Sequence, residues 1–242
     1  MRRGFSLVEL LVVLAIVGIL ISFMVPAIGG AQRLNQTTVC KNNQRQLVLA
    51  AVQYTNDFET YPPAFTSEFK AWDDETILWQ YIDTPIEQMM CPKHIHTNHS
   101  ASGYNYNTSF IGSEAYISGF VVDGVQPSDC KHPSHCAMFG DSSKNKFMRS
   151  PDADAVYDPY TDPNTRCAGM QDFRHDGGTV VAWLDGHVSV QHKAYNECND
   201  DEDSGFLSED NSLYNPISFV LHSFQGYATQ DTCVPASTSA SD

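Results

Sequence analysis

RGFSLVELLVVLAIVGILISFMVPAI, residues 3–28, is the stretch that decides the fold, because it stays apolar for longer than a core helix usually does. Beyond Gly4, only three polar residues interrupt it: Ser6, Glu9 and Ser22. As an α-helix, residues 5–28 would extend about 36 Å, and the hydrocarbon core of a bilayer is about 30 Å thick. We therefore predict a transmembrane helix over residues 5–30.

Two basic residues, Arg2 and Arg3, stand directly ahead of the run and favour a cytoplasmic N-terminus. The same pattern is also typical of a cleaved secretory signal. Glu9 argues against that alternative, because a carboxylate in hydrocarbon costs several kcal/mol unless it finds a partner. A cut after Gly4 would supply one, the new amine of Phe5, either in the same helix or on a neighbouring subunit. Such a pair can set the register of an assembly.

The segment Arg3-Gly4-Phe5-Ser6-Leu7-Val8-Glu9, with the apolar run to Pro26, resembles the class III signal of type IV pilins and type II secretion pseudopilins. The resemblance implies that prepilin peptidase cuts between Gly4 and Phe5, releases residues 1–4 as a leader, and methylates the amine of Phe5. It also implies an assembly role for Glu9 and a helix kink at Pro26. The alternative is an ordinary signal peptide or a simple membrane anchor.

The helical pattern resumes after Pro26, and residues 31–60 are predicted to form an amphipathic helix that continues into a head. Apolar residues recur there at helical spacing, as Val39, Leu47, Ala50, Ala51, Tyr54 and Phe58. Polar residues lie opposite them, as Lys41, Asn42, Arg45 and Asn56. A break at Gly29-Gly30, giving a separate short helix, is the alternative.

Residues 61–235 are predicted to form a loop-rich globular head, and residues 236–242 a disordered tail. The clearest strand signal is Thr179–Leu184, followed by Asp185-Gly186 and by His187–Val190. Asp-Gly between two β-rich runs predicts a hairpin with a type I′ turn. Alternate residues of the first run are apolar on both faces, which indicates a central strand between the helix and covering loops.

The same hairpin carries a second resemblance. His175, nine intervening residues, and Asp185-Gly186 resemble the H-X9-DG element of a large group of bacterial prepilin-like proteins. Further matches follow the same order along the chain: Cys40-Lys-Asn-Asn43, Tyr61-Pro62, Cys91-Pro92 and Phe139-Gly-Asp-Ser142. The resemblance assigns no biochemical role to the element.

A hydrolytic triad can be imagined from His175 and Asp185 with Ser142 or Cys167. We favour the simpler interpretation, in which His175 and Asp185 hydrogen-bond turn backbone. The chain contains no Gly-x-Ser-x-Gly nucleophile elbow. We therefore predict that the protein is not an enzyme.

The chain has seven cysteines, and no two of them form a Cys-x-x-Cys pair. In an exported protein the default expectation is disulfide bonding, with a reduced protein or a metal site as the alternatives. The preferred pairs are Cys130–Cys136 and Cys198–Cys233, then Cys40–Cys91, with Cys167 left over.

No cofactor is required by these patterns, but two kinds of residue cluster could bind a metal ion. Imidazoles cluster at His94, His96 and His99, and again at His132 and His135, which adventitious surface histidines explain more simply. Carboxylates cluster at Asp200, Asp201, Glu202 and Asp203, and near Asp152, Asp154, Asp158 and Asp162. Such oxygen ligands suit Ca²⁺, which major pseudopilins use in the C-terminal part of the head. A solvated acidic loop is the simpler interpretation.

The net charge is strongly negative, with 14 Lys and Arg against 29 Asp and Glu, for a formal charge of −15. Such a surface repels phosphate backbones, so no nucleic-acid partner is expected. We predict an α+β, type IV pilin-like fold: a long N-terminal helix packed under an antiparallel sheet with long loops.

The function expected from that fold is structural. The chain would be a single-pass protein of the bacterial cytoplasmic membrane, processed by prepilin peptidase and passed to an assembly platform. It would then self-associate into a pilus or pseudopilus in the periplasm or at the cell surface. The alternative is a membrane-tethered binding module or hydrolase that never polymerises.

Overall fold

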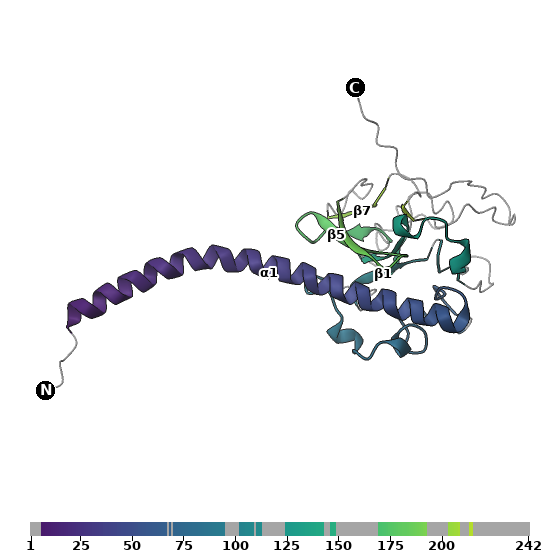
Figure 1. Cartoon of the computed structure of the whole chain (residues 1–242), viewed down its shortest axis with the longest axis horizontal. Helices are drawn as coiled ribbons and strands as arrows, with labels where there is room; N and C mark the ends of the chain where they lie inside the picture. Colours follow the sequence, from purple (N-terminus) through teal and green to yellow (C-terminus); the bar gives the residue numbers. More distant parts are fainter. Residues whose placement is uncertain are drawn as a thin grey trace, which may run out of the picture. The chain divides into compact units, whose positions relative to one another are not determined.

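The computed structural model describes residues 6–66, 68, 70–94, 102–108, 110–112, 124–142, 146–148, 169–192, 203–208 and 213–214. The chain divides into two units, residues 1–38 and residues 39–242, which are described separately. One helix, α1 (Leu7–Phe58), contributes to both (Figure 1). The predicted long N-terminal helix is confirmed. It runs through Gly29-Gly30, so the break considered there is absent.

In the first unit, α1 has apolar side chains on all sides between Leu7 and Ile28. Its large apolar side chains between Leu7 and Ile28 are 43% to 74% exposed wherever the structure describes them. Their hydropathy and length are sufficient for a membrane span, a test that signal sequences also pass. With no apolar partner in its own unit, this surface requires lipid or other helices.

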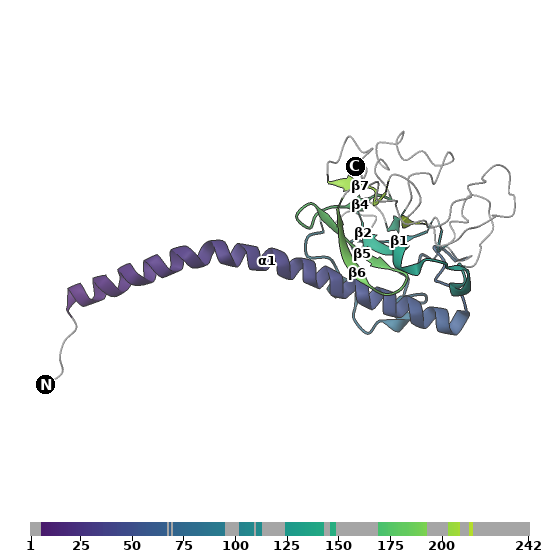
Figure 2. The same cartoon turned by 45° about the horizontal axis from the view of Figure 1, so that its top comes forward.

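In the second unit, the remainder of α1 buries one face against a β-sheet (Figure 2). Leu47, Val48, Ala50 and Ala51 lie in one core cluster with residues of the sheet. Trp72, Leu78 and Trp79 also belong to this cluster. The packing explains the helical spacing of the apolar residues in residues 39–51. Phe58, which the pattern placed on the same stripe, is 54% exposed at the end of α1.

The larger sheet has five strands in the order β3-β1-β2-β5-β6. Their bounds are Tyr104–Asn107 (β1), Ala137–Asp141 (β2), Phe147–Met148 (β3), Gly178–Trp183 (β5) and Val188–His192 (β6). Three of the four pairings are antiparallel, as predicted, but β1 and β3 run parallel. The sheet is therefore mixed.

Short elements complete the described head. β4 (Gln171–Asp172) and β7 (Ser204–Gly205) form a second, two-stranded antiparallel sheet. The described residues of the head also form four 3₁₀ helices: Trp79–Tyr81 (η1), Ile86–Gln88 (η2), Pro127–Asp129 (η4) and Pro133–His135 (η5). Between these elements, much of the described head is loop.

The predicted hairpin is present as β5 and β6, but its turn differs from the expectation. Trp183 N donates to His187 O at 3.0 Å, and Gly186 N donates to Trp183 O at 2.9 Å. The loop therefore has three residues, Leu184 to Gly186, and only Gly186 has a positive φ, 92°. A type I′ turn needs two such residues, so this loop corresponds to a turn closed by a glycine bulge.

β5 is an interior strand whose residues are buried on both faces, as predicted. Val180, Ala182 and Leu184 face the cluster that contains α1. Val181 and Trp183 face a second cluster with Met170, Phe206, Leu207 and Tyr214. The helix thus covers one face, and segments from outside the larger sheet cover the other.

Candidate functional site

The first turn of α1 is closed by two side-chain hydrogen bonds, one to the carboxylate of Glu9 and one to the hydroxyl of Ser6. Ser6 N donates to Glu9 Oε2 at 2.8 Å, and Val8 N donates to Ser6 Oγ at 3.3 Å. Ser-x-x-Glu at a helix start is a capping box, which satisfies backbone N–H groups that have no helical partner. The sequence carried this signal, but Glu9 was considered only as a charge. Glu9 therefore has a local role as well.

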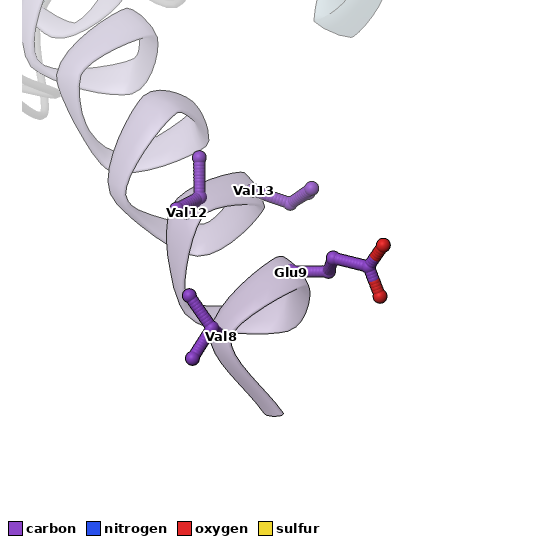
Figure 3. A pocket seen from close by; sticks show the side chains of 4 residues that line it. All are labelled: Val8, Glu9, Val12 and Val13. Carbon is purple, nitrogen blue, oxygen red and sulfur yellow. The ribbon is translucent and has the colours of Figure 1, made fainter. Parts of the chain in front are cut away.

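Glu9 points away from the helix axis beside Val12 and Val13 (Figure 3). Its carboxylate is exposed in the isolated chain. Among the other residues assigned to processing and assembly, Gly4 and Phe5 lie outside the described residues. Pro26 lies within α1, which continues past it.

Asp185 of the H-X9-DG pattern lies in the hairpin turn, as expected. Its Oδ1 accepts a hydrogen bond from His187 N at 3.1 Å and lies 2.6 Å from His187 Nδ1. Gly186 supplies the positive φ that closes the loop. The Asp-Gly part of the H-X9-DG pattern therefore forms the turn between β5 and β6.

The ring of His175 has side-chain neighbours inside the head, and the expectation that it hydrogen-bonds turn backbone stays a prediction. Its ring is fully buried, with Nε2 3.3 Å from Asp141 Oδ2 and 3.6 Å from Cys91 Sγ. The turn is held by its backbone, which exchanges hydrogen bonds with Gly178. His175 therefore belongs to a cluster inside the head rather than to a pair with Asp185.

Four side chains form this cluster, which we call the Cys-His-Asp cluster: Cys40, Cys91, Asp141 and His175. All four residues are buried, and one side-chain atom of each lies within 4.8 Å of the others. They come from α1, the segment after η2, the end of β2 and the turn before β5. Four separate segments of the head therefore meet at one point.

Asp141 is the most strongly anchored member. Its Oδ2 accepts from Val180 N at 2.7 Å, and its Oδ1 accepts from Gln44 Nε2 at 3.3 Å. Arg174 Nη2 lies 3.3 Å from Oδ1. Burial pushes the pKa of Asp141 up, but Arg174 and His175 outweigh it and hold the pKa below its ordinary value. Asp141 therefore carries a negative charge in the core.

The other members respond to that charge and to one another. Burial lowers the pKa of His175, but hydrogen bonds to Asp141 and Cys91 outweigh it and raise the pKa to about 9. The hydrogen bond between the thiols lowers the pKa of Cys91 and raises that of Cys40, which burial raises further. The cluster thus concentrates groups that exchange protons and bind cations.

The geometry does not support a hydrolytic triad. His175 uses the same nitrogen, Nε2, toward both Cys91 and Asp141. In a triad the carboxylate holds one imidazole nitrogen while the other faces the nucleophile. Cys91 is also only 3% exposed, which leaves a substrate no approach to its sulfur. Ser142 is buried, and Cys167 lies outside the described residues.

One of the three predicted disulfides lies outside the described residues, and the other two are absent from this structure. Cys40, Cys91, Cys130 and Cys136 are thiols in this structure, so neither Cys130–Cys136 nor Cys40–Cys91 is bonded in it. Cys136 Sγ lies instead 3.0 Å from Tyr214 O, and Cys130 Sγ lies 3.8 Å from Gln126 O. Cys198 and Cys233 lie outside the described residues, and their pairing stays a prediction.

None of the metal ligands predicted from the sequence belongs to the Cys-His-Asp cluster. His132 and His135 are exposed, and His94 is buried with Nδ1 3.1 Å from Arg174 Nη1. His96, His99, Asp200, Asp201, Glu202 and the acidic residues 152–162 lie outside the described residues. Asp203 is described and exposed. Calcium binding there stays a prediction.

Sequence reasoning missed the polar residues that surround the cluster. Asn43 and Gln44 lie on the buried face of α1, where Asn43 Nδ2 donates to Met89 O at 2.8 Å. Nor did the sequence indicate that Arg174, which precedes His175, would contact Asp141. One signal was present: Cys40, Cys91, Asp141 and His175 each fall within a separate motif noted along the chain.

Residues 1–25 match the family described as the prokaryotic N-terminal methylation motif. Neither the comparison with curated proteins nor that with solved structures found a match. The motif and the apolar helix that contains it support a type IV prepilin-like precursor, anchored in the membrane through α1. A motif of this kind implies processing by prepilin peptidase and a structural rather than enzymatic role.

Proposed function

We propose that this chain is a structural subunit that polymerises through α1 into a type IV pilus or a secretion-type pseudopilus. The observation that carries the proposal is the methylation motif at the start of a helix whose apolar residues are exposed on all sides. After cleavage at Gly4-Phe5, the mature chain would pass from the cytoplasmic membrane to an assembly platform. The filament would then lie in the periplasm or at the cell surface.

The exposed apolar surface supports assembly on energetic grounds. Each large apolar side chain gains about 1.5–3 kcal/mol when it moves from water into an apolar environment. Lipid supplies that environment to the precursor, and the helices of neighbouring subunits can supply it in a filament. A head that left the membrane without such neighbours would expose the whole run from Leu7 to Ile28 to water.

Glu9 supports the same proposal from its charge. The capping box explains a hydrogen-bond acceptor at this position, and glutamine serves that role as well as glutamate. A full negative charge within an apolar run requires a partner of opposite sign. The amine of Phe5 on a neighbouring subunit is the partner we propose, because the cut at Gly4 creates it.

The experiment separates charge from capping by comparing two variants in cells that assemble the filament. Glu9→Gln keeps the capping acceptor and removes the charge, so we expect filament yield to collapse while the protein stays in the membrane. Ser6→Ala removes one capping bond, which costs about 1 kcal/mol, and keeps the charge. We expect it to retain filaments. Sheared surface filaments and membrane fractions, quantified by immunoblot, give both readings.

Two other results would contradict the proposal. Normal filament yield from Glu9→Gln would show that the charge has no part in assembly. Equal loss from both variants would reduce the role of Glu9 to capping the helix.

The H-X9-DG resemblance is a further part of this proposal. His175, Asp185 and Gly186 would place the chain in that group of prepilin-like proteins. The side chain of His175 is buried in the head, and Asp185 and Gly186 form the turn between β5 and β6. This arrangement supports a stabilising role in the head and no catalytic one.

A further inference from the structure

We propose that Cys40, Cys91, Asp141 and His175 bind a single Zn²⁺ ion that ties α1 to the head. This inference is independent of filament assembly, because all four residues belong to the second unit. Two thiolates, an imidazole and a carboxylate are each established zinc ligands, and four protein ligands close a structural site.

The distances fit a tetrahedral ion. Zinc ligands lie at about 2.3 Å for sulfur and about 2.1 Å for nitrogen and oxygen, which places nitrogen about 3.4 Å from oxygen and about 3.6 Å from sulfur. The observed separations are 3.3 Å from His175 Nε2 to Asp141 Oδ2 and 3.6 Å from His175 Nε2 to Cys91 Sγ. Every pair of candidate ligand atoms lies within 4.8 Å. Only small side-chain movements are needed.

The surrounding charges also fit. Two thiolates and one carboxylate carry three negative charges, and Zn²⁺ with the guanidinium of Arg174 carries three positive ones. Arg174 lies 3.3 Å from the Asp141 oxygen that is not turned toward His175. Val180 N and Gln44 Nε2 also hold the carboxylate. Metal ligands are typically oriented by such outer hydrogen bonds, so the carboxylate is positioned before the ion binds.

Zinc is favoured over other ions by the ligand types. Thiolate ligands exclude Ca²⁺ and Mg²⁺, which take oxygen ligands. A redox-inert ion is compatible with paired thiolates in an exported protein, where Cu²⁺ would oxidise them. Since four segments of the head converge on the site, the ion would act as a cross-link between Cys40 on α1 and the loops and strands around it.

The rival explanation is the Cys40–Cys91 disulfide. A disulfide consumes both thiols and leaves the imidazole of His175 and the carboxylate of Asp141 buried without the sulfur partner. The two explanations exclude one another within one molecule, so a single preparation can decide between them.

The test uses the full chain, extracted in detergent from zinc-supplemented cells and purified without reductant. We expect elemental analysis to find one zinc per chain and non-reducing peptide mapping to find no Cys40–Cys91 link. Replacement of zinc by Co²⁺ should produce the intense sulfur-to-metal charge-transfer absorption that thiolate ligands cause. Cys91→Ser should lose the zinc, whereas Cys136→Ser, which changes another fully buried thiol, should retain it.

The wild-type protein alone can overturn the proposal, even if Cys91→Ser fails to fold. No bound zinc, or a Cys40–Cys91 disulfide in its place, would do so. A Co²⁺ form without thiolate absorption would also contradict it, as would undiminished zinc in Cys91→Ser.

Discussion

Leu14 and Leu47 lie on the same helix, yet Leu14 is 59% exposed and Leu47 is fully buried. The difference extends to the residues around them. Up to Ile28, α1 presents apolar side chains on every face, whereas after Val39 it buries one face that includes Cys40, Asn43 and Gln44. One backbone thus serves two environments. The first half is suited to apolar neighbours from outside the chain, and the second to polar and apolar partners within the head.

The two halves of α1 differ in which side chains they expose: the first exposes apolar side chains, and the second buries polar ones. Apolar residues face outward in the first, and the amide of Gln44 is buried against Asp141 and Val180 in the second. Gln44 Nε2 donates hydrogen bonds to both of these residues, and such partners stabilise a buried donor. The second half of α1 is therefore matched to this head, whereas the apolar side chains of the first half can pack against lipid or against neighbouring helices.

The largest expected effect comes from making the same substitution, leucine to alanine, in each half of α1. Leu47→Ala should destabilise the head by about 2–5 kcal/mol, because it leaves a cavity in a packed core. Leu14→Ala should leave head stability unchanged, since Leu14 belongs to the first unit and its side chain is 59% exposed. All three tryptophans lie in the head, so their fluorescence during denaturation of the detergent-solubilised chain reports on it selectively.

Equal midpoints for Leu47→Ala and the wild type would mean that α1 is not part of the head core. A comparable loss from Leu14→Ala would mean that the two halves are not independent. Either outcome would remove the contrast on which this account depends.

A smaller effect tests the hairpin that packs against the second half of α1. The backbone φ of Gly186 is 92°, a value that residues other than glycine rarely adopt. Gly186→Ala should lower the melting temperature by about 2–4 °C, as expected for about 1 kcal/mol in a domain of this size. Gly186→Asn should cost less, because asparagine tolerates positive φ better. Equal melting temperatures for all three proteins would contradict the assigned turn.

Sequence patterns predicted the elements whose causes are local. Continuous apolar residues indicated α1, helical spacing indicated its buried face from Leu47 to Ala51, and Asp185-Gly186 indicated the β5–β6 hairpin. The turn type was wrong because Asp-Gly suits several tight turns, and the flanking register decides among them. The parallel pairing of β3 with β1 depends on the path of the intervening chain, which no local pattern records.

The Cys-His-Asp cluster was not predicted, because its members are far apart in the sequence. The sequence suggested a disulfide between Cys40 and Cys91. It also suggested that His175 lies near Asp185, at the other end of the same strand. The true partner, Asp141, ends a neighbouring strand, and β2–β5 pairing brings it to His175. Only the sheet order places these two side chains together.

The central claim is that the first residues of this chain are a prepilin signal rather than an ordinary secretory signal peptide. Mass spectrometry of the N-terminus of the mature protein, isolated from bacteria that process it, tests this claim most directly. The account predicts a chain that begins at Phe5 with a methylated amine. A mature chain that begins near Ala31 would identify an ordinary signal peptide and would contradict the account.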